Sequence, residues 1–235
     1  MNGVFDLGGT DGLGRIGPTP AEPPFHHDWE KAAFTMQLGC FRGGWFSIDS
    51  FRHGIELMDP VVYLSSPYYE HWLHSFEHHG ITKGHLDRAE LDRRTQYYLD
   101  NPDAPLPAHE PDPELLEFVS AVVSAGAPAD RPTDKPIRFQ VGDLVRVRSV
   151  APFGHTRMAR YVRGKVATVV AHRGSFVFPD ASGNERGEDP QHLYTIQFDA
   201  AELWGEEHAD VNTSTTFDAW DPYIEPVSEH GGVTA

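Results

Sequence analysis

The hydrophobic pattern of this 235-residue chain changes at Gly126, and the change separates two parts that cannot share one type of fold. Before Gly126, apolar residues recur every three or four positions, which is typical of amphipathic helices. After it, apolar and polar residues alternate over short runs, which is typical of half-buried strands. The sequence therefore predicts an α+β chain with a helical domain at 27–126, a linker at 127–136 and a small antiparallel barrel or roll at 137–235.

Capping residues and alternation place the individual elements. A short polar residue precedes each apolar run of the first part, often with proline next, which favours the start of a helix. The predicted cap residues are Asp28, Ser47, Asp59, Ser66, Asp87 and Asp112. Helices are expected from Asp28 through Met36, at 48–58, after Asp59, at 68–79 (capped by Ser66), at 87–99 and at 113–125. Residues 101–113 hold five prolines and must form an extended connector. Strands are expected at 144–150, 165–170, 193–198, 215–219 and 223–227.

Residues 1–26 resemble neither part. They combine glycine and proline with isolated apolar residues such as Val4, Phe5 and Leu7, and they follow neither period. A flexible tail is usually more polar than this. Both an extended arm laid along another surface and a disordered terminus are compatible with the composition.

Charge and cysteine content exclude several classes of function. With 19 basic and 35 acidic residues and a formal charge of −16, the chain is not expected to bind nucleic acid or an anionic membrane. Its single cysteine, Cys40, cannot form an internal disulfide, a cysteine zinc site or an iron–sulfur cluster. No apolar run approaches the roughly 18 residues of a membrane span and no secretion signal is evident, so a cytoplasmic location is expected.

The histidines His71, His74, His78 and His79 form a candidate metal site. Their spacing of three and four residues would place side chains on neighbouring turns of a helix. The spacing matches no zinc-protease pattern, because Trp72 stands where that pattern needs a glutamate. A solvated, histidine-rich helix face is the alternative.

Arg52 occupies a position that needs an explanation. It falls on the apolar stripe that Ile48, Phe51 and Ile55 form in the helix expected at 48–58. A guanidinium buried there without an anionic partner would cost several kcal/mol. Arg52 must therefore keep its charge in water at the edge of the stripe, or meet negative oxygens supplied from elsewhere.

Two further runs could carry function. GHTRMARYVRGK holds its basic residues without one carboxylate, which indicates an anionic target or a simple exposed hairpin. Those residues are Arg157, Arg160, Arg163 and Lys165. SPYYEHW places Tyr68 and Trp72 four residues apart, so the two rings would be adjacent on a helix. Such a pair suits either a pocket wall that carries one hydroxyl or core packing.

Several segments together resemble the beta subunit of nitrile hydratase. They are MNGVFDLGGTDGLGRI, FHHDWE, SPYYEHW, GHTRMARYVRGKVATV, AELWG and PYIEPV, and they follow the order of that family from Met1 to about Val227. The resemblance implies that the second part is an SH3-like antiparallel β-barrel. It also implies that residues 1–26 form an extended arm that contacts a partner subunit.

The resemblance implies an activity as well. The family hydrates nitriles to amides, a lyase reaction, at a cobalt(III) or iron(III) centre. The alpha subunit holds that metal through cysteines, some of them oxidised to sulfenic and sulfinic forms. This chain would hold no metal and would act only with an alpha subunit, as an αβ unit or an α2β2 heterotetramer, on a small nitrile. The segment at 81–110 resembles the cobalt-type members.

The same resemblance assigns residues to roles. Arg52 and Arg157 match arginines that hydrogen-bond the oxygens of the oxidised cysteines, and Tyr68 matches a tyrosine that points into the substrate cavity. These would be the catalytic residues. The positions that match the wall of the substrate pocket are Ile48, Phe51, Trp72 and Gln37, and Gln37 stands where some relatives carry an aromatic residue.

Three alternatives stay open. The first is a relative similar to thiocyanate hydrolase, in which the beta-like part is split over more than one chain, unlike this continuous one. The second is a non-catalytic SH3-like metal-delivery or activator protein, which would need neither the long helical part nor the Tyr68–Trp72 pair. The third is a standalone metal hydrolase that uses the histidines at 71–79.

Overall fold

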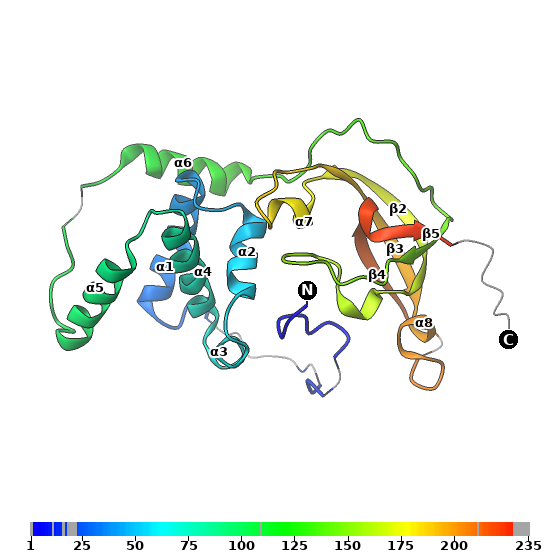
Figure 1. The fold of residues 1–235 in the computed structure, drawn as a ribbon, viewed down its shortest axis with the longest axis horizontal. Helices are drawn as coiled ribbons and strands as arrows, with labels where there is room; N and C mark the ends of the chain where they lie inside the picture. The colour runs from blue at the N-terminus through cyan, green and yellow to red at the C-terminus, as the bar shows by residue number, and fades with distance from the viewer. Residues whose placement is uncertain are drawn as a thin grey trace. The chain divides into compact units, whose positions relative to one another are not determined.

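The chain divides into a helical unit and a β unit. The computed structural model describes residues 2–10, 12–15, 17, 23–108, 110–210 and 212–227. Arg15–Pro128 make up the helical unit, and Met1–Gly14 together with Ala129–Ala235 make up the β unit (Figure 1). The α+β class expected from the periodicity is confirmed.

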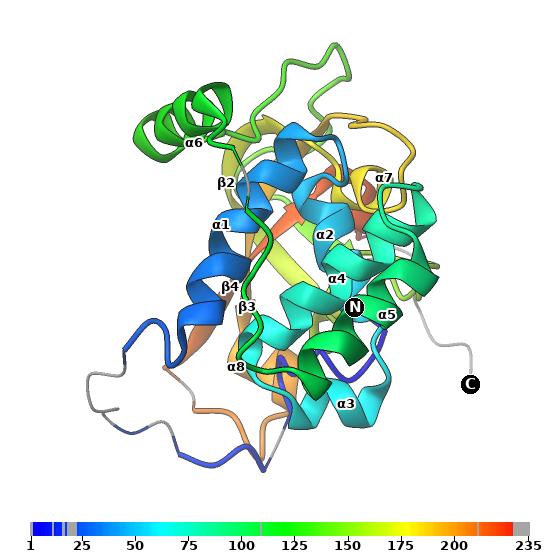
Figure 2. The same cartoon turned by 90° about the vertical axis from the view of Figure 1, so that its left-hand side faces the viewer.

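The helices begin where short polar side chains can cap them. The helical unit contains α1 (Asp28–Arg42), α2 (Ile48–Glu56), α3 (Pro60–Ser65), α4 (Tyr68–Thr82), α5 (Arg88–Asp100) and α6 (Pro113–Ala125). The predicted caps of α2, α3, α5 and α6 are confirmed, because the side chains of Ser47, Asp59, Asp87 and Asp112 each accept a first-turn backbone N–H. Figure 2 shows the proline-rich connector between α5 and α6 as an extended chain.

Two of the predicted cap residues are wrong. His27, not Asp28, is the N-cap residue of α1, and the Glu30 carboxylate accepts the His27 backbone N–H at 3.2 Å. Ser66 does not cap α4, because its hydroxyl donates to the Val62 carbonyl of α3 at 2.6 Å. In addition, α4 continues past Gly80. A Cβ at Gly80 would lie 2.6 Å from Leu86, so this glycine serves close packing rather than termination.

The helical unit is held together by an aromatic core and by polar contacts between α2 and α4. Its buried residues are Ala33, Cys40, Phe46, Phe51, Tyr69, Trp72 and Phe76. The Ser75 hydroxyl of α4 donates to the Phe51 carbonyl of α2 at 2.7 Å. His79 Nε2 lies 2.7 Å from the Ser50 carbonyl, and since a carbonyl only accepts, that ring nitrogen carries the proton. These bonds fix α2 against α4.

Gly54 permits this close approach of the two helices, and an alanine there is expected to destabilise the protein. A Cβ at Gly54 would lie 2.4 Å from Ser75 Oγ and 3.0 Å from His79 Nε2. Overpacking of this kind costs about 1–3 kcal/mol, which is roughly 2–12 °C in Tm for a chain of this size. Calorimetry of Gly54→Ala checks the expected loss.

Gly39→Ala is the matched control for Gly54→Ala. Gly39 also lies inside a helix, α1, but the nearest atoms to its added Cβ are 4.0 Å away, on Leu115. Because alanine is the better helix former, Gly39→Ala is expected to keep or raise Tm. If Gly54→Ala and Gly39→Ala lower Tm equally, the close approach of α2 and α4 is not the reason why residue 54 must be glycine.

The β unit is built on one antiparallel sheet. It contains β1 (Leu144–Val147), β2 (Val166–Phe176), β3 (Gln191–Asp199), β4 (Ser214–Trp220) and β5 (Ile224–Pro226), in the order β4-β3-β2-β1-β5. Each predicted strand is present, although β1 is shorter than expected and β2, which is bulged against β3, is longer. Within the described residues β4 and β5 are not paired with each other, so the sheet is not closed and the SH3-like barrel stays a prediction.

Short helices and an alternating core complete this unit. The helical turns are η1 (Arg160–Val162), α7 (Pro179–Ser182), α8 (Ala200–Trp204) and η2 (Asp221–Tyr223). Strand residues that point inward, such as Val145, Val147, Ile196 and Phe198, are fully buried, as alternation requires.

The first residues of the expected arm lie against the β unit of this chain. Asn2 Nδ2 donates to the Pro152 carbonyl at 2.6 Å, and Asp6 is buried with its carboxylate against Arg160. Leu7 and Leu13 remain exposed. Residues 11, 16 and 18–22 lie outside the described part, and a contact of the arm with a partner subunit stays a prediction.

Candidate functional site

Three of the predicted site residues come together where α2 packs on α4. The rings of Phe51 and Trp72 meet edge to face with centroids 5.3 Å apart. The Trp72 ring also contacts Tyr68, at 5.8 Å. Phe51 and Trp72 are buried, whereas Tyr68 is 64% exposed. The contacts therefore produce a rigid aromatic base with one exposed phenol, which can serve as the wall of a binding site.

Arg52 follows Phe51 in α2 and lies at the surface. Its side chain is 45% exposed, and Nη1 contacts Asp49 Oδ1 at 3.2 Å. Asp49 itself is only 5% exposed. The helix is turned so that the carboxylate is buried and the guanidinium reaches solvent beside it. In this chain Arg52 is therefore exposed, and its contact with negative oxygens of another subunit stays a prediction.

The other two predicted wall residues, Ile48 and Gln37, lie on two different helices. Ile48 is the first residue of α2 and is 41% exposed. Gln37 is half-buried in α1, which packs against α4. The predicted wall residues of the helical unit therefore come from α1, α2 and α4.

The histidines at 71–79 do not form a metal site in the described part of the chain. Their nitrogen atoms do not converge as a group of three or more possible ligands. His79 is bonded to the Ser50 carbonyl, and the His71 ring stacks on Tyr63 with centroids 4.6 Å apart. Burial lowers the pKa of His74 below its usual value. The prediction of a standalone metal hydrolase loses its basis.

Most residues of the basic run form contacts within the β unit. Arg160 contacts Asp6, Arg163 donates to Asn2 Oδ1 at 2.8 Å, and Lys165 donates to the Glu202 carbonyl at 2.7 Å. Arg157 differs from these residues, since its side chain is exposed and only its backbone N–H is bonded among the described residues, to Tyr223 Oη at 3.0 Å. Arg157 is thus the one residue of the run whose guanidinium is available to a ligand or partner within the described structure.

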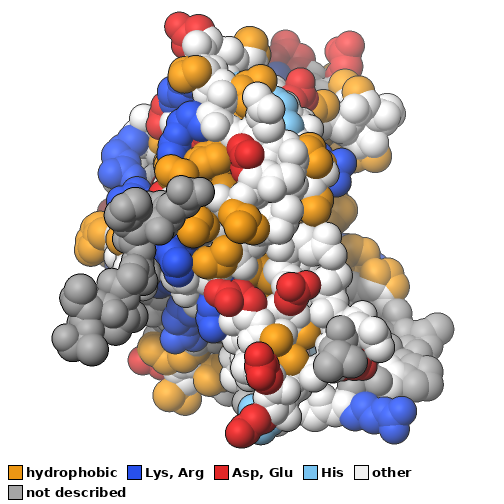
Figure 3. Space-filling model, turned by 90° about the vertical axis from the view of Figure 1, so that its right-hand side faces the viewer, with side chains coloured by type: hydrophobic (Ala, Val, Ile, Leu, Met, Phe, Trp, Pro, Cys, Tyr) orange, Lys and Arg blue, Asp and Glu red, His pale blue; other side chains and the backbone are white. Residues whose placement is uncertain are grey.

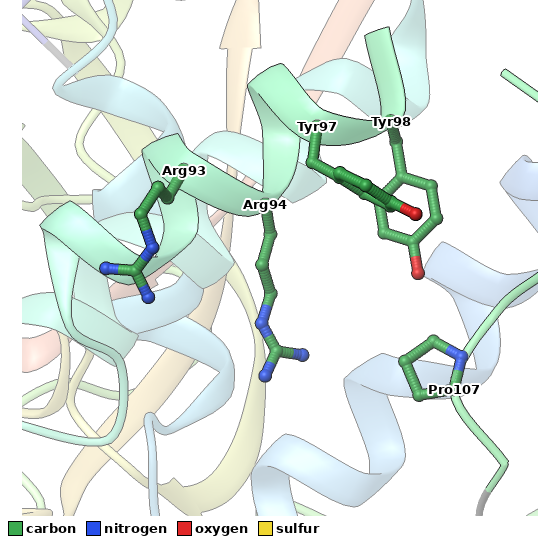
Figure 4. Close-up of a pocket in the computed structure, with 5 residues that line it drawn as sticks. All are labelled: Arg93, Arg94, Tyr97, Tyr98 and Pro107. Carbon is green, nitrogen blue, oxygen red and sulfur yellow. The ribbon is translucent and has the colours of Figure 1, made fainter. Parts of the chain in front are cut away.

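An open pocket of about 410 Å³ lies elsewhere in the helical unit, between α5 and the connector. In Figure 4 the Tyr98 hydroxyl points toward Pro107, and Arg93, Arg94 and Tyr97 extend from the same helix. Both arginines pair with the same carboxylate, that of Glu90, so one of their two charges is compensated. None of the predicted site residues lines this pocket.

Sequence reasoning missed the residues that support the two arginines. The Asp49–Arg52 spacing of three residues was a usable local signal for a helical ion pair. The contact of Tyr223 with the Arg157 backbone spans 66 residues, and no pattern in the sequence indicates it.

Figure 3 shows Lys and Arg side chains gathered along one side of the face it presents, next to exposed hydrophobic side chains, despite the acidic composition of the chain.

None of the helices that the structure describes combines the length and the apolar character needed to cross a membrane.

Comparison with known proteins assigns the class of this α+β chain. Two family descriptions match it: "Nitrile hydratase beta subunit, N-terminal" over residues 1–115 and "Nitrile hydratase beta subunit, C-terminal" over residues 128–226. The two matches together cover most of the chain. The chain therefore belongs to the nitrile hydratase beta subunit family.

Individual relatives agree with this assignment. The chain is 66% identical to nitrile hydratase subunit beta from Rhodococcus sp over 235 residues, covering 100% of both chains. It is 55% identical to the cobalt-containing nitrile hydratase subunit beta of Pseudonocardia thermophila, covering 97% of each. Thiocyanate hydrolase subunit alpha of Thiobacillus thioparus matches only 92 residues at 32% identity, covering 37% of this chain and 71% of that protein.

Proposed function

We propose that this chain is the beta subunit of a cobalt-type nitrile hydratase, a lyase that converts a small nitrile and water into an amide. The alpha subunit holds the metal. This chain provides arginines that hydrogen-bond the oxidised cysteines around the metal, and it provides part of the substrate pocket. The Phe51–Trp72–Tyr68 contact carries the proposal, because it presents an exposed phenol next to an apolar wall on the helix pair that also carries Arg52.

Cys40 does not fit a cysteine-ligated cobalt site within this chain. It is the only cysteine, it is buried, and burial raises the pKa of the thiol to about 11. Metal ligation requires the thiolate. In our proposal the cysteine ligands come from the alpha subunit, where the metal would supply Lewis-acid chemistry.

Exposed apolar helices in the helical unit support an extensive partner interface. None of the residues of α3, α5 or α6 is buried, although these helices carry large apolar side chains. The most exposed are Val61, Leu64, Leu99, Leu116 and Val123, at 63–74%. Helices of this kind draw their stability from packing of an apolar face, and an alpha subunit would cover them. The arm at 1–26 would add to this contact, and the assembly would be αβ or α2β2.

Each site residue has a role that its exposure allows. Arg52 and Arg157 would donate hydrogen bonds to oxidised-cysteine oxygens of the alpha subunit, a task suited to the rigid guanidinium fork. The Tyr68 hydroxyl would orient the nitrile or move a proton. The wall of the pocket would be formed by Ile48, Phe51, Trp72 and Gln37. An SH3-like barrel in the β unit belongs to the same proposal.

Nitrile-to-amide turnover with and without the partner tests this function. The chain is produced alone and together with its cysteine-rich alpha subunit, with cobalt supplied in both cases. We expect amide formation only from the co-expressed pair. Turnover by the chain alone would contradict the assignment of the metal to the alpha subunit. If the pair hydrolyses thiocyanate but does not hydrate nitriles, the enzyme acts on a different substrate class.

A further inference from the structure

Arg157 lies in a segment without regular secondary structure, yet its neighbours are among the most buried residues of the protein. Residues 148–159 form neither helix nor strand. Thr156 is 0% exposed and Met158 is 1% exposed, while the Arg157 side chain reaches solvent. The exposed guanidinium is thus carried by a backbone that is anchored on both sides.

Tyr223 is the centre of that anchor. Its hydroxyl oxygen accepts the Arg157 backbone N–H at 3.0 Å and the Thr156 hydroxyl at 3.3 Å. The same hydroxyl donates to Asp180 Oδ1. Thr156 Oγ1 in turn accepts the Met158 backbone N–H at 3.2 Å. A single phenol therefore uses its one donor and both acceptor positions to fix the backbone of the arginine.

Hydrogen bonds of Asp180 and Asn184 also hold this part of the backbone in place. Asn184 accepts the His155 backbone N–H and donates to the His155 carbonyl, both at 3.0 Å. Asn184 also donates to the Asp180 backbone carbonyl at 2.7 Å. The segments approach so closely that Gly154, at φ +75°, has no room for a side chain: a Cβ would lie 1.9 Å from Asn184 Oδ1.

The protonation state of Tyr223 favours this arrangement. Burial, followed by the nearby Asp180 carboxylate, raises the pKa of Tyr223 far above its usual value, so the phenol keeps the proton it donates. Burial also raises the pKa of Asp180, and its hydrogen bond with Tyr223 opposes that rise. A phenylalanine at residue 223 would leave three buried polar groups without this partner.

We propose that Tyr223, supported by Asp180, is a positioning residue for Arg157: it fixes the backbone from which the guanidinium reaches the alpha subunit. This inference rests on the proposed function, in which Arg157 bonds oxygens of that subunit. Tyr223 itself is 2% exposed and does not touch substrate. Its effect passes through the placement of Arg157.

Tyr223→Phe in the cobalt-loaded αβ enzyme tests the proposal, with Tyr194→Phe as the matched control. Tyr194 is also fully buried in the β unit, and its hydroxyl accepts a backbone N–H, that of Arg138 at 3.2 Å. We expect Tyr223→Phe to lower kcat by about 10- to 100-fold, since misplacement by about 1 Å has effects of that size. KM should change little, and amide hydrogen exchange at 156–158 should accelerate. Tyr194→Phe should lower Tm without either effect.

Two further variants, Thr156→Val and Arg157→Lys, distinguish failure of the positioning proposal from failure of the proposed function. Thr156→Val removes the bonds of Thr156 to Tyr223 and to the Met158 backbone but keeps the bond between Arg157 and Tyr223. It should therefore reproduce part of the loss of kcat and of the faster exchange even if Tyr223→Phe does not fold. If neither Tyr223→Phe nor Thr156→Val affects kcat and exchange more than Tyr194→Phe, the positioning role is overturned. Arg157→Lys with full activity would instead contradict the proposed function of the arginine, and the exchange result would still decide whether Tyr223 fixes the backbone.

Discussion

Replacing Arg52 with lysine is expected to remove most of the nitrile-hydrating activity of the αβ enzyme while leaving its assembly intact. Arginine presents donors in a fixed planar fork, and the compact ammonium of lysine cannot reproduce it. Loss of a hydrogen bond to a charged group costs about 1.5–3 kcal/mol, which corresponds to a decrease in kcat of roughly 10- to 150-fold. Steady-state kinetics on the co-purified αβ enzyme measures this decrease.

Arg93→Lys is the control for Arg52→Lys. Arg93 also pairs with an acidic residue three positions earlier in its helix, Glu90, and it is more exposed than Arg52. Because it lies on α5, away from the α2–α4 group, Arg93→Lys should keep full activity. Full activity in Arg52→Lys, or an equal loss in Arg93→Lys, would contradict the role assigned to Arg52.

Removing the Asp6 carboxylate is expected to destabilise the β unit. Asp6 is 1% exposed, its Oδ2 accepts the Arg160 backbone N–H at 2.9 Å, and Arg160 Nε lies 3.4 Å from the same oxygen. Loss of these carboxylate contacts in Asp6→Ala should cost about 1–3 kcal/mol. For a chain of this size that is roughly 2–12 °C in Tm, measured by calorimetry.

Asp6→Asn separates the hydrogen bond from the charge. The amide oxygen can still accept the Arg160 N–H, so this variant should lose less stability than Asp6→Ala. Unchanged Tm in both variants would mean that residues 2–10 do not support the β unit, and that the ordered start of the chain serves only contact with a partner.

The elements of the fold were largely predictable because their causes are local. Ser47, Asp59, Asp87 and Asp112 cap helices through bonds to residues two or three positions ahead, and such bonds follow from sequence spacing. The strands follow from alternation along a single segment. Ser66 failed as a predicted cap because a competing local bond, to the Val62 carbonyl, was also within reach.

The candidate site was predictable only in part. Its residues in the helical unit follow from family resemblance, and the Tyr68–Trp72 contact also follows from helical spacing. The burial of Asp49 and the exposure of Arg52 did not follow from the apolar stripe. Polar bonds from Ser75 and His79 of α4 fix α2 in its orientation, and a pattern within α2 contains no information about them.

The sequence alone determined the α+β class, the division into two parts, the presence of a single cysteine, and the membership in a family of beta subunits. The tertiary structure decided which charged side chains form contacts within the chain and which remain exposed to a ligand or partner. Arg160 is bonded by Asp6 across 154 positions, whereas the Arg157 guanidinium reaches solvent on a backbone that Tyr223 holds across 66. The physical reason is that capping and periodicity depend on neighbours along the chain, while the surroundings of a buried carboxylate or phenol form only when distant segments pack together.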